Sequence, residues 1–110
     1  QQKYVLGIDI GGTSVKAGLF NTAGDLVGSG YSECEMSSSV PGEAEHDAES
    51  SWLATIDAVR CATADVSGCD VKAIGVGCTN GLIAVDAQGR PIRPAIMLWD
   101  QRSLTEFENI

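Results

Sequence analysis

The apolar positions near the start of the chain follow a pattern that predicts two paired β-strands. Residues Tyr4–Ile10 form an apolar run rich in β-branched side chains, which is typical of a buried strand. In Val15–Phe20 the apolar residues alternate, so that Val15, Ala17 and Leu19 share one face of an extended chain. Gly11-Gly12 between the runs predicts a hairpin turn, in which glycine adopts a positive φ at little steric cost.

The pattern then predicts a third strand and a helix. Residues Leu26–Tyr31 follow a turn-rich segment at 21–25, so the first three strands form a β-meander. Serine, proline and glycine predict a loop at 35–45. Asp47 is the expected N-cap of a helix with Trp52, Ile56 and Val59 on its apolar side, and Ser67-Gly68 is the expected end, with Gly68 as a left-handed cap.

A second set of short strands follows the helix. Residues 71–76 predict a strand parallel to an earlier one, because a crossover helix precedes it. A loop at 77–81 lies at its carboxyl end. Further strands are expected at 82–85 and 91–98, and a helix is expected at 103–110. One complete helix covers only one face of such a sheet, so residues 1–110 are expected to be the N-terminal part of the first domain of a longer protein.

Composition and charge narrow the functional classes. The chain has 110 residues, 44% of them hydrophobic, which suits one globular domain. It contains no apolar run of membrane-spanning length and no signal peptide, so a cytoplasmic location and no membrane partner are expected. The net charge of −8 argues against nucleic acid as a partner.

The cysteines and histidine predict no metal site. Four cysteines lack any Cys-x-x-Cys spacing and accompany a single histidine, His46, so we expect reduced thiols and no zinc. Cys61 and Trp52 are expected in the helix core, and His46 is expected to be structural. Cys78, at a strand end, is a weaker candidate for a pocket residue.

The strongest candidate chemistry surrounds the first turn. Asp9 ends an apolar strand, where its carboxylate is a suitable Mg²⁺ ligand. The backbone of Gly11 and Gly12 can approach a phosphate closely. Thr13 and Ser14 add hydroxyl donors, and Lys16 adds a positive charge. The plain alternative is a hairpin with a Gly-Gly turn and no ligand.

This Asp-x-Gly-Gly-Thr turn resembles the first phosphate loop of the actin-like ATPase and sugar kinase superfamily. Later segments narrow the resemblance to the FGGY carbohydrate kinases. They are Pro41-Gly42-x-x-Glu45-His46-Asp47 followed by Trp52, Ala73–Val76 followed by Gly81–Asp86-x-x-Gly89-x-Pro91, and Arg93–Arg102 with its Trp99-Asp100-Gln101-Arg102 end. The Gly-Gly-Thr form is commoner in the ROK and hexokinase sugar kinases, so that branch is the alternative. A non-catalytic ATPase of the actin or chaperone type is a third possibility.

The resemblance implies an α/β, ribonuclease-H-like fold, with ATP and Mg²⁺ used to phosphorylate a sugar or polyol. It implies that Gly11, Gly12, Thr13, Ser14 and Lys16 face the phosphates and that Asp9 binds the metal. Asn80, Trp99 and Asp100 are the expected substrate residues; Asp100 pairing with Arg102 is the alternative.

It also implies that the catalytic base and the nucleotide domain lie beyond Ile110, so that these residues are inactive alone, and it leaves a homodimer open for the complete protein. The loop Cys78-Thr79-Asn80-Gly81 differs from the Gln-Arg-Glu and Gln-Met-His forms of some members. A ketose or polyol other than glycerol or D-xylulose is therefore expected.

Overall fold

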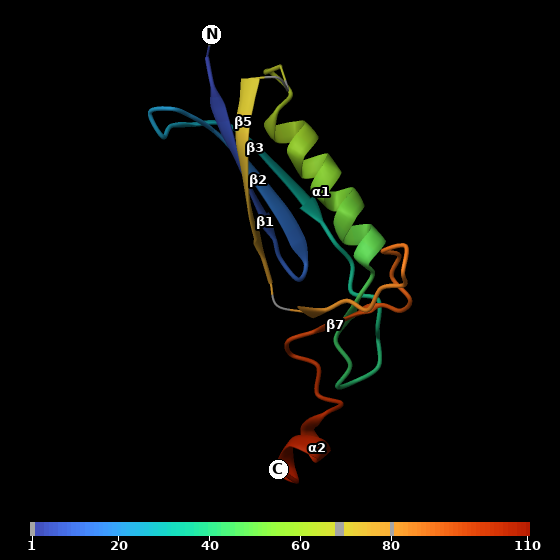
Figure 1. Cartoon of the computed structure of the whole chain (residues 1–110). Helices are drawn as coiled ribbons and strands as arrows, with labels where there is room; N and C mark the ends of the chain where they lie inside the picture. The colour runs from blue at the N-terminus through green and yellow to red at the C-terminus, as the bar shows by residue number, and fades with distance from the viewer. Residues whose placement is uncertain (1, 68–69, 80) are drawn as a thin grey trace.

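The main sheet has four strands and is mixed in direction. The computed structural model describes residues 2–67, 70–79 and 81–110 (Figure 1). The order in the sheet is β3-β2-β1-β5, with the first three strands antiparallel and β5 parallel to β1. The strands are β1 (Tyr4–Ile10), β2 (Ser14–Asn21), β3 (Leu26–Glu33) and β5 (Val71–Cys78). The predicted β-meander and the parallel fourth strand are confirmed.

Helix α1 (Ala48–Ala62) makes the crossover between β3 and β5. The predicted N-cap is confirmed, because the Asp47 carboxylate accepts a hydrogen bond from the Ser50 amide at 2.9 Å. The helix ends at Ala62, five residues before the predicted Ser67. There the Thr63 amide and hydroxyl both donate to the Val59 carbonyl, at 3.0 and 2.8 Å. The predicted cap Gly68 lies outside the described residues.

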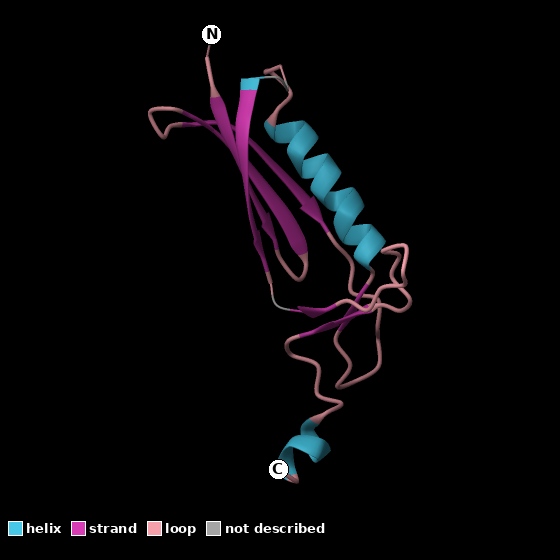
Figure 2. Cartoon of the chain, in the orientation of Figure 1, coloured by secondary structure: helices cyan, strands magenta, loops and turns pink. Residues whose placement is uncertain are grey.

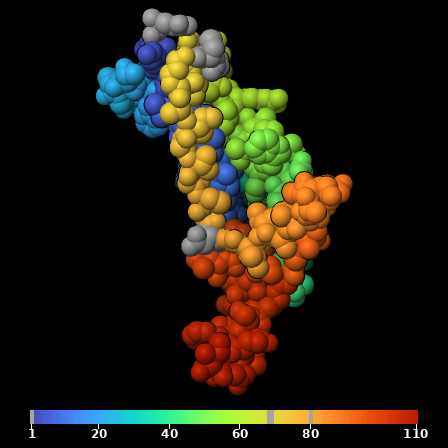
Figure 3. Space-filling model, in the orientation of Figure 1, coloured from blue at the N-terminus to red at the C-terminus, as the bar shows by residue number. Residues whose placement is uncertain are grey.

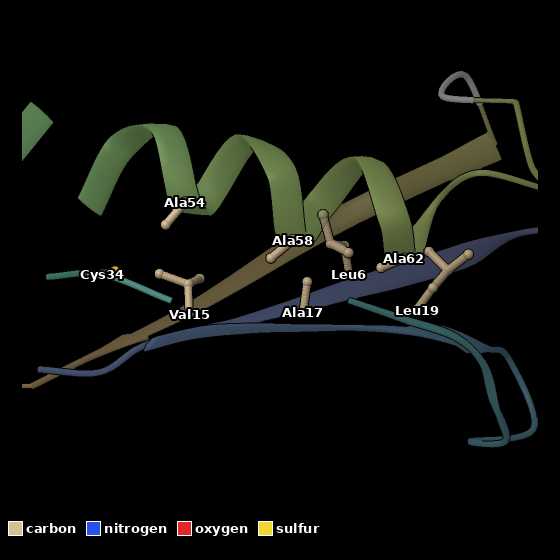
Figure 4. Packing of buried hydrophobic residues seen from close by; sticks show 8 residues of the cluster. All are labelled: Leu6, Val15, Ala17, Leu19, Cys34, Ala54, Ala58 and Ala62. Atoms are coloured by element: carbon tan, nitrogen blue, oxygen red, sulfur yellow. The ribbon is translucent and has the colours of Figure 1, made fainter. Parts of the chain in front are cut away.

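Small side chains make the contact between α1 and the sheet (Figure 4). Ala54, Ala58 and Ala62 point at the sheet and pack against Leu6, Val15, Ala17 and Leu19. A Cβ on Gly30 would lie 1.9 Å from the Ala58 carbonyl oxygen, and one on Gly28 would lie 2.2 Å from that of Ala62. The helix therefore rests directly on the backbone of β3.

The prediction that Trp52 and Cys61 lie in the helix core is wrong. Trp52 is 58% exposed and Cys61 is also exposed. The buried stripe consists of alanines spaced four residues apart together with Thr55. A large side chain has no room where the helix touches glycine backbone, so the bulky residues point elsewhere.

A second, small sheet lies at the end of the main sheet where the β1–β2 turn is found (Figure 2). Its order is β4-β7-β6, all antiparallel, with β4 (Glu45–His46), β6 (Gly81–Leu82) and β7 (Ala95–Met97). Strand β4, which the sequence did not predict, begins at the last residue of the segment predicted as a loop. The strands predicted at 82–85 and 91–98 are shorter than expected, and a single bridge between Val85 and Pro91 joins their outer parts.

Helix α2 (Leu104–Glu108) is fully exposed and gives the molecule its extended outline (Figure 3). The described chain measures 59 × 28 × 24 Å. Helix α1 contacts β3, β2 and β1, and no described element packs on the opposite face of the main sheet. The expected one-sided sheet is thus confirmed for this part of the chain. None of the described helices has the length and apolar character needed to cross a membrane.

Candidate functional site

The turn between β1 and β2 is tied to its surroundings on both sides. The Gly11 amide donates to the Ser14 carbonyl at 2.8 Å and closes the turn. The Cys34 amide, just after β3, donates to the Thr13 carbonyl at 2.8 Å. On the other side the Thr79 amide, just after β5, donates to the Ile10 carbonyl at 2.8 Å. Neighbouring strand ends therefore fix the shape of this turn.

Glycine is needed in the turn for space and not for a positive φ. Neither Gly11 nor Gly12 has a positive φ, which corrects the sequence-based expectation. A Cβ on Gly11 would lie 2.8 Å from the Ser14 carbonyl oxygen, and one on Gly12 would lie 2.3 Å from Cη2 of Trp99. The turn thus comes close to its own backbone and to an indole ring 87 positions away in the chain.

Two backbone donors in this turn are available to a ligand. Within the described residues, the amides of Gly12 and Thr13 donate no hydrogen bond, and the hydroxyls of Thr13 and Ser14 engage no partner. Thr13 is exposed. Adjacent amides without partners are the donors that an anion-binding loop requires. The turn can therefore accept a phosphate through its backbone.

Asp9 and Lys16 are cross-strand neighbours on the face of the sheet that α1 does not cover. They are paired in the register of β1 and β2, and Gly77 lies on the other side of Asp9. Both side chains are exposed, and neither forms an ion pair or hydrogen bond with another described residue. An exposed carboxylate beside phosphate-accepting amides suits Mg²⁺, which binds proteins through one or two carboxylates and keeps several waters. No group of three ligating side chains occurs in the described part of the chain.

Glycines form the floor beside Asp9 and Lys16. Gly18, Gly7 and Gly75 are in register across β2, β1 and β5, and with Gly77 they line a shallow hollow next to the Asp9–Lys16 pair. Phe20 and Leu26 bound the hollow at its far end. Phe20 and Leu26 fill the space over Gly18, whereas no atom lies within 4 Å of where a Cβ on Gly75 would stand, so the open part of this floor is over β5.

Trp99 reaches the β1–β2 turn from a distant part of the chain. It follows β7 in a turn that the Asp100 amide closes by donating to the Met97 carbonyl at 3.0 Å. Its indole lies over Gly12 and remains 46% exposed. The structure therefore brings together two of the sequence-predicted groups, the phosphate turn and the substrate-side tryptophan.

Asp100 is engaged with the protein. Its Oδ2 accepts from the Ala44 amide and from Arg102 Nη2, each at 2.8 Å, and its Oδ1 accepts from the Arg102 amide and Nε, each at 3.0 Å. These bonds, first of all those from the Arg102 side chain and then that from the Ala44 amide, hold the pKa of Asp100 well below its usual range. Of the two roles predicted from the sequence, pairing with Arg102 is the one seen. The third substrate-side candidate, Asn80, lies outside the described residues.

A cavity of about 250 Å³ lies beside the turn, between the N-terminal half of α1 and the small sheet. Gly11, Cys78 and Thr79 line it on the strand side, so Cys78 does reach a pocket. His46 and Ser51 line it on the helix side. Sequence reasoning missed this cavity, because its walls come from four separate segments.

His46 is a structural residue in this wall. It is buried, its Nδ1 faces the Glu35 carbonyl oxygen at 3.0 Å, and its Nε2 contacts the Ser51 hydroxyl. A carbonyl only accepts, so Nδ1 carries a proton and donates to Glu35. Burial raises the pKa of the nearby Cys34 thiol, although a hydrogen bond with Ser51 partly opposes this.

Comparison with known proteins places these features in a family. A model described as the FGGY family of carbohydrate kinases, N-terminal domain, matches residues 4–110. The xylulose kinase of Staphylococcus xylosus is 34% identical over 108 residues, covering 97% of this chain and 22% of that protein. A glycerol kinase from a Nostoc species is 35% identical over 104 residues, covering 91% of this chain and 21% of that protein.

A solved structure agrees with the sequence comparisons on the fold. The crystal structure of gluconate kinase from Lactobacillus acidophilus superposes with a TM-score of 0.92, covering 99% of this chain and 22% of the other. At 22% identity this likeness bears on the fold alone. The chain thus spans about a fifth of the length of the relatives it matches.

Proposed function

The chain belongs to the FGGY family of carbohydrate kinases, and from that membership we propose that the complete protein transfers the γ-phosphoryl group of ATP to a hydroxyl of a sugar or polyol. The observation that carries the proposal is the β1–β2 turn beside Trp99. Its Gly12 and Thr13 amides and the neighbouring Asp9 carboxylate have no hydrogen-bond or ion-pair partner among the described residues. The family match favours this reading over the ROK or hexokinase branch and over a non-catalytic ATPase.

The turn is proposed to hold the phosphate chain of ATP. Phosphoryl transfer needs little covalent work from the protein, so catalysis depends on positioning and on neutralising charge. The amides of Gly12 and Thr13 would donate to phosphate oxygens, with the hydroxyls of Thr13 and Ser14 within the same turn. Gly11 is proposed to close the turn, since its amide already donates to the Ser14 carbonyl.

The charged pair beside the turn is proposed to serve the same phosphates. Asp9 would hold Mg²⁺, directly or through water, and the bound ion would offset the negative charge of the phosphate oxygens. Lys16, its cross-strand neighbour, would face the phosphates from the same side. The catalytic base and the adenosine pocket are proposed to lie outside these residues.

The sugar is proposed to bind on the Trp99 side of the turn. An indole face packs well on the C–H groups of a sugar, and Asn80 follows the carboxyl end of β5, where ligands of α/β sheets tend to bind. Asp100 already accepts hydrogen bonds on both oxygens, so we assign it to the support of Trp99 rather than to a sugar hydroxyl. A panel of ketoses, polyols and aldonates assayed with the complete protein would identify the substrate; the loop at 78–81 favours one other than glycerol or D-xylulose.

The Asp9→Asn variant tests the proposal. Removing one preorganised charge at a transferring group typically lowers kcat about 10²–10³-fold, and we expect a loss of that order with little change in sugar affinity. Asp25→Asn is the matched control, because Asp25 is exposed in the β2–β3 turn at the other end of the sheet (Figure 1). A folded Asp9→Asn protein with wild-type kcat would rule out the metal role, and the absence of ATP-dependent phosphorylation of every sugar would rule out the kinase.

A further inference from the structure

The turn that carries Trp99 begins at the buried Met97, and polar contacts hold both of its ends. Leu98 is 71% exposed and Trp99 is 46% exposed, so neither side chain is fixed in a core. Instead, the Met97 amide at the start of the turn donates to the Ala44 carbonyl at 2.8 Å. The Asp100 carboxylate at its end accepts from the Ala44 amide at 2.8 Å. Both ends of the turn are thus fixed to one residue of the segment before β4.

Arg102 fixes the end of that turn to β4. Its Nη2 and Nε bind the Asp100 carboxylate at 2.8–3.1 Å, and its Nη1 lies 2.8 Å from Oε1 of Glu45. The same Glu45 oxygen accepts from Nη2 of Arg93 at 2.6 Å, and Glu43 lies 3.7 Å from Arg102 Nη1. The planar, forked guanidinium can face two carboxylates in fixed directions, which a lysine ammonium cannot do.

Strand β4 connects this arrangement to the rigid part of the fold. Glu45 is followed by the buried His46 and by Asp47, the N-cap of α1. The position of Arg102 is therefore set by the start of α1, and Arg102 in turn sets the position of Asp100, next to Trp99. The Asp100 side chain is only 7% exposed, so it has little freedom to turn away.

We propose that Arg102 is a positioning residue that holds Trp99 over the phosphate turn by clamping Asp100 to Glu45. The indole that lies on Gly12 then forms a wall between the phosphate turn and the substrate side. The consequence for turnover rests on the proposed kinase function, whereas the position of the indole does not. Arg102 itself touches no proposed ligand and acts through Asp100 and Trp99.

The position of Trp99 is measured directly by ¹⁹F NMR of the complete protein labelled with 5-fluorotryptophan. The Trp99 resonance is identified by its loss in Trp99→Phe. We expect this resonance to shift or broaden in Arg102→Met and, to a smaller extent, in Arg102→Lys, which keeps the charge but loses the fork. Arg90→Met is the matched control, because Arg90 pairs with Asp86 in a separate turn and contacts no residue of the clamp. An unmoved Trp99 resonance in a folded Arg102→Met protein overturns the proposal.

Steady-state kinetics then test whether the position of Trp99 affects kcat/KM for the sugar. We expect Arg102→Met to lower kcat/KM for the sugar about tenfold, and to add less than about twofold when Trp99 is already alanine, because both changes remove one positioned ring. Equal losses in the two backgrounds, or a moved resonance with unchanged kcat/KM, overturn the positioning role. If Arg102→Met does not fold, Arg102→Lys and Glu45→Gln provide the same comparisons. A protein that phosphorylates no sugar refutes the proposed function alone, since the NMR result still decides where Arg102 holds the ring.

Discussion

A single methyl group placed on Gly12 should push Trp99 away from the β1–β2 turn. In Gly12→Ala the new Cβ would lie 2.3 Å from Cη2 of Trp99, 3.1 Å from Cζ2 and 3.3 Å from Cζ3. Carbon atoms in ordinary contact are about 3.5–4.0 Å apart, so the edge of the ring must withdraw by roughly 1.2 Å or more. The φ of Gly12 is not positive, so the backbone itself does not oppose alanine.

The magnitude follows from the balance between overpacking and backbone entropy. Adding a methyl to a filled site costs about 1–3 kcal/mol, and replacing glycine by alanine where φ permits returns about 0.4–1 kcal/mol through the unfolded state. We expect a net loss of about 1–2 kcal/mol in the free energy of unfolding. If the protein is the proposed kinase, a ring displaced by about 1 Å is also enough to lower kcat by up to about 10²-fold.

A double-mutant cycle separates the ring from the backbone. The free energies of unfolding of wild type, Gly12→Ala, Trp99→Ala and the double variant are measured by urea titration under identical conditions. In the Trp99→Ala background the added methyl meets no ring, so Gly12→Ala should be neutral or slightly stabilising, giving a coupling of about 1–3 kcal/mol. If Gly12→Ala costs the same in both backgrounds, the ring is not what requires glycine here, and the reasoning fails.

Two further perturbations test the packing and the electrostatics. Gly30→Ala should lower the free energy of unfolding by about 3 kcal/mol or prevent folding, because its Cβ would meet the Ala58 carbonyl oxygen at 1.9 Å and the helix backbone must move. The control is Gly7→Ala, whose Cβ has its nearest atom at 3.8 Å and which should stay within about 1 kcal/mol of wild type. Equal effects of the two variants would contradict this packing. For Asp100, whose pKa is lowered by Arg102 and the Ala44 amide, the ionised form stabilises the fold above about pH 4 and that contribution is lost as pH falls below it. Thermal melts from pH 6 to pH 2 should therefore decline more steeply for wild type than for Asp100→Asn, and parallel curves would show that the carboxylate is not linked to folding.

The sequence determined the elements that local chemistry specifies. The apolar run at 4–10 predicted the observed bounds of β1, and the apolar alternation predicted β2 to within one residue at each end. The turn chemistry at 21–25 predicted the meander and the start of β3, which ends two residues later than expected. Asp47 was identifiable as an N-cap because a short acidic side chain before a helical period satisfies amides in its own first turn. The candidate site at Asp9–Lys16 was also recognisable from the sequence, because all its groups lie within eight neighbouring positions.

The face of α1 that is buried was decided by tertiary structure. From the sequence, Trp52 was placed in the apolar stripe of the helix, yet it is exposed, and the contact is made by alanines. The reason lies in β3, where Gly28 and Gly30 let the helix approach so closely that only a methyl fits between the two backbones. The helical period alone carries no information about that distance.

The site was likewise completed only by the fold. The sequence marked Gly12 as a glycine of a phosphate turn and Trp99 as a substrate-side residue, but it gave the wrong reason for Gly12 and left the role of Asp100 open. Chain topology places the segment after β7 beside the β1–β2 turn. There the indole of Trp99 leaves no room for a Cβ at Gly12, and Arg102 binds the Asp100 carboxylate. Neighbouring residues determine local conformational preferences. A contact between positions 12 and 99 depends instead on how every intervening element packs, which only the tertiary structure decides.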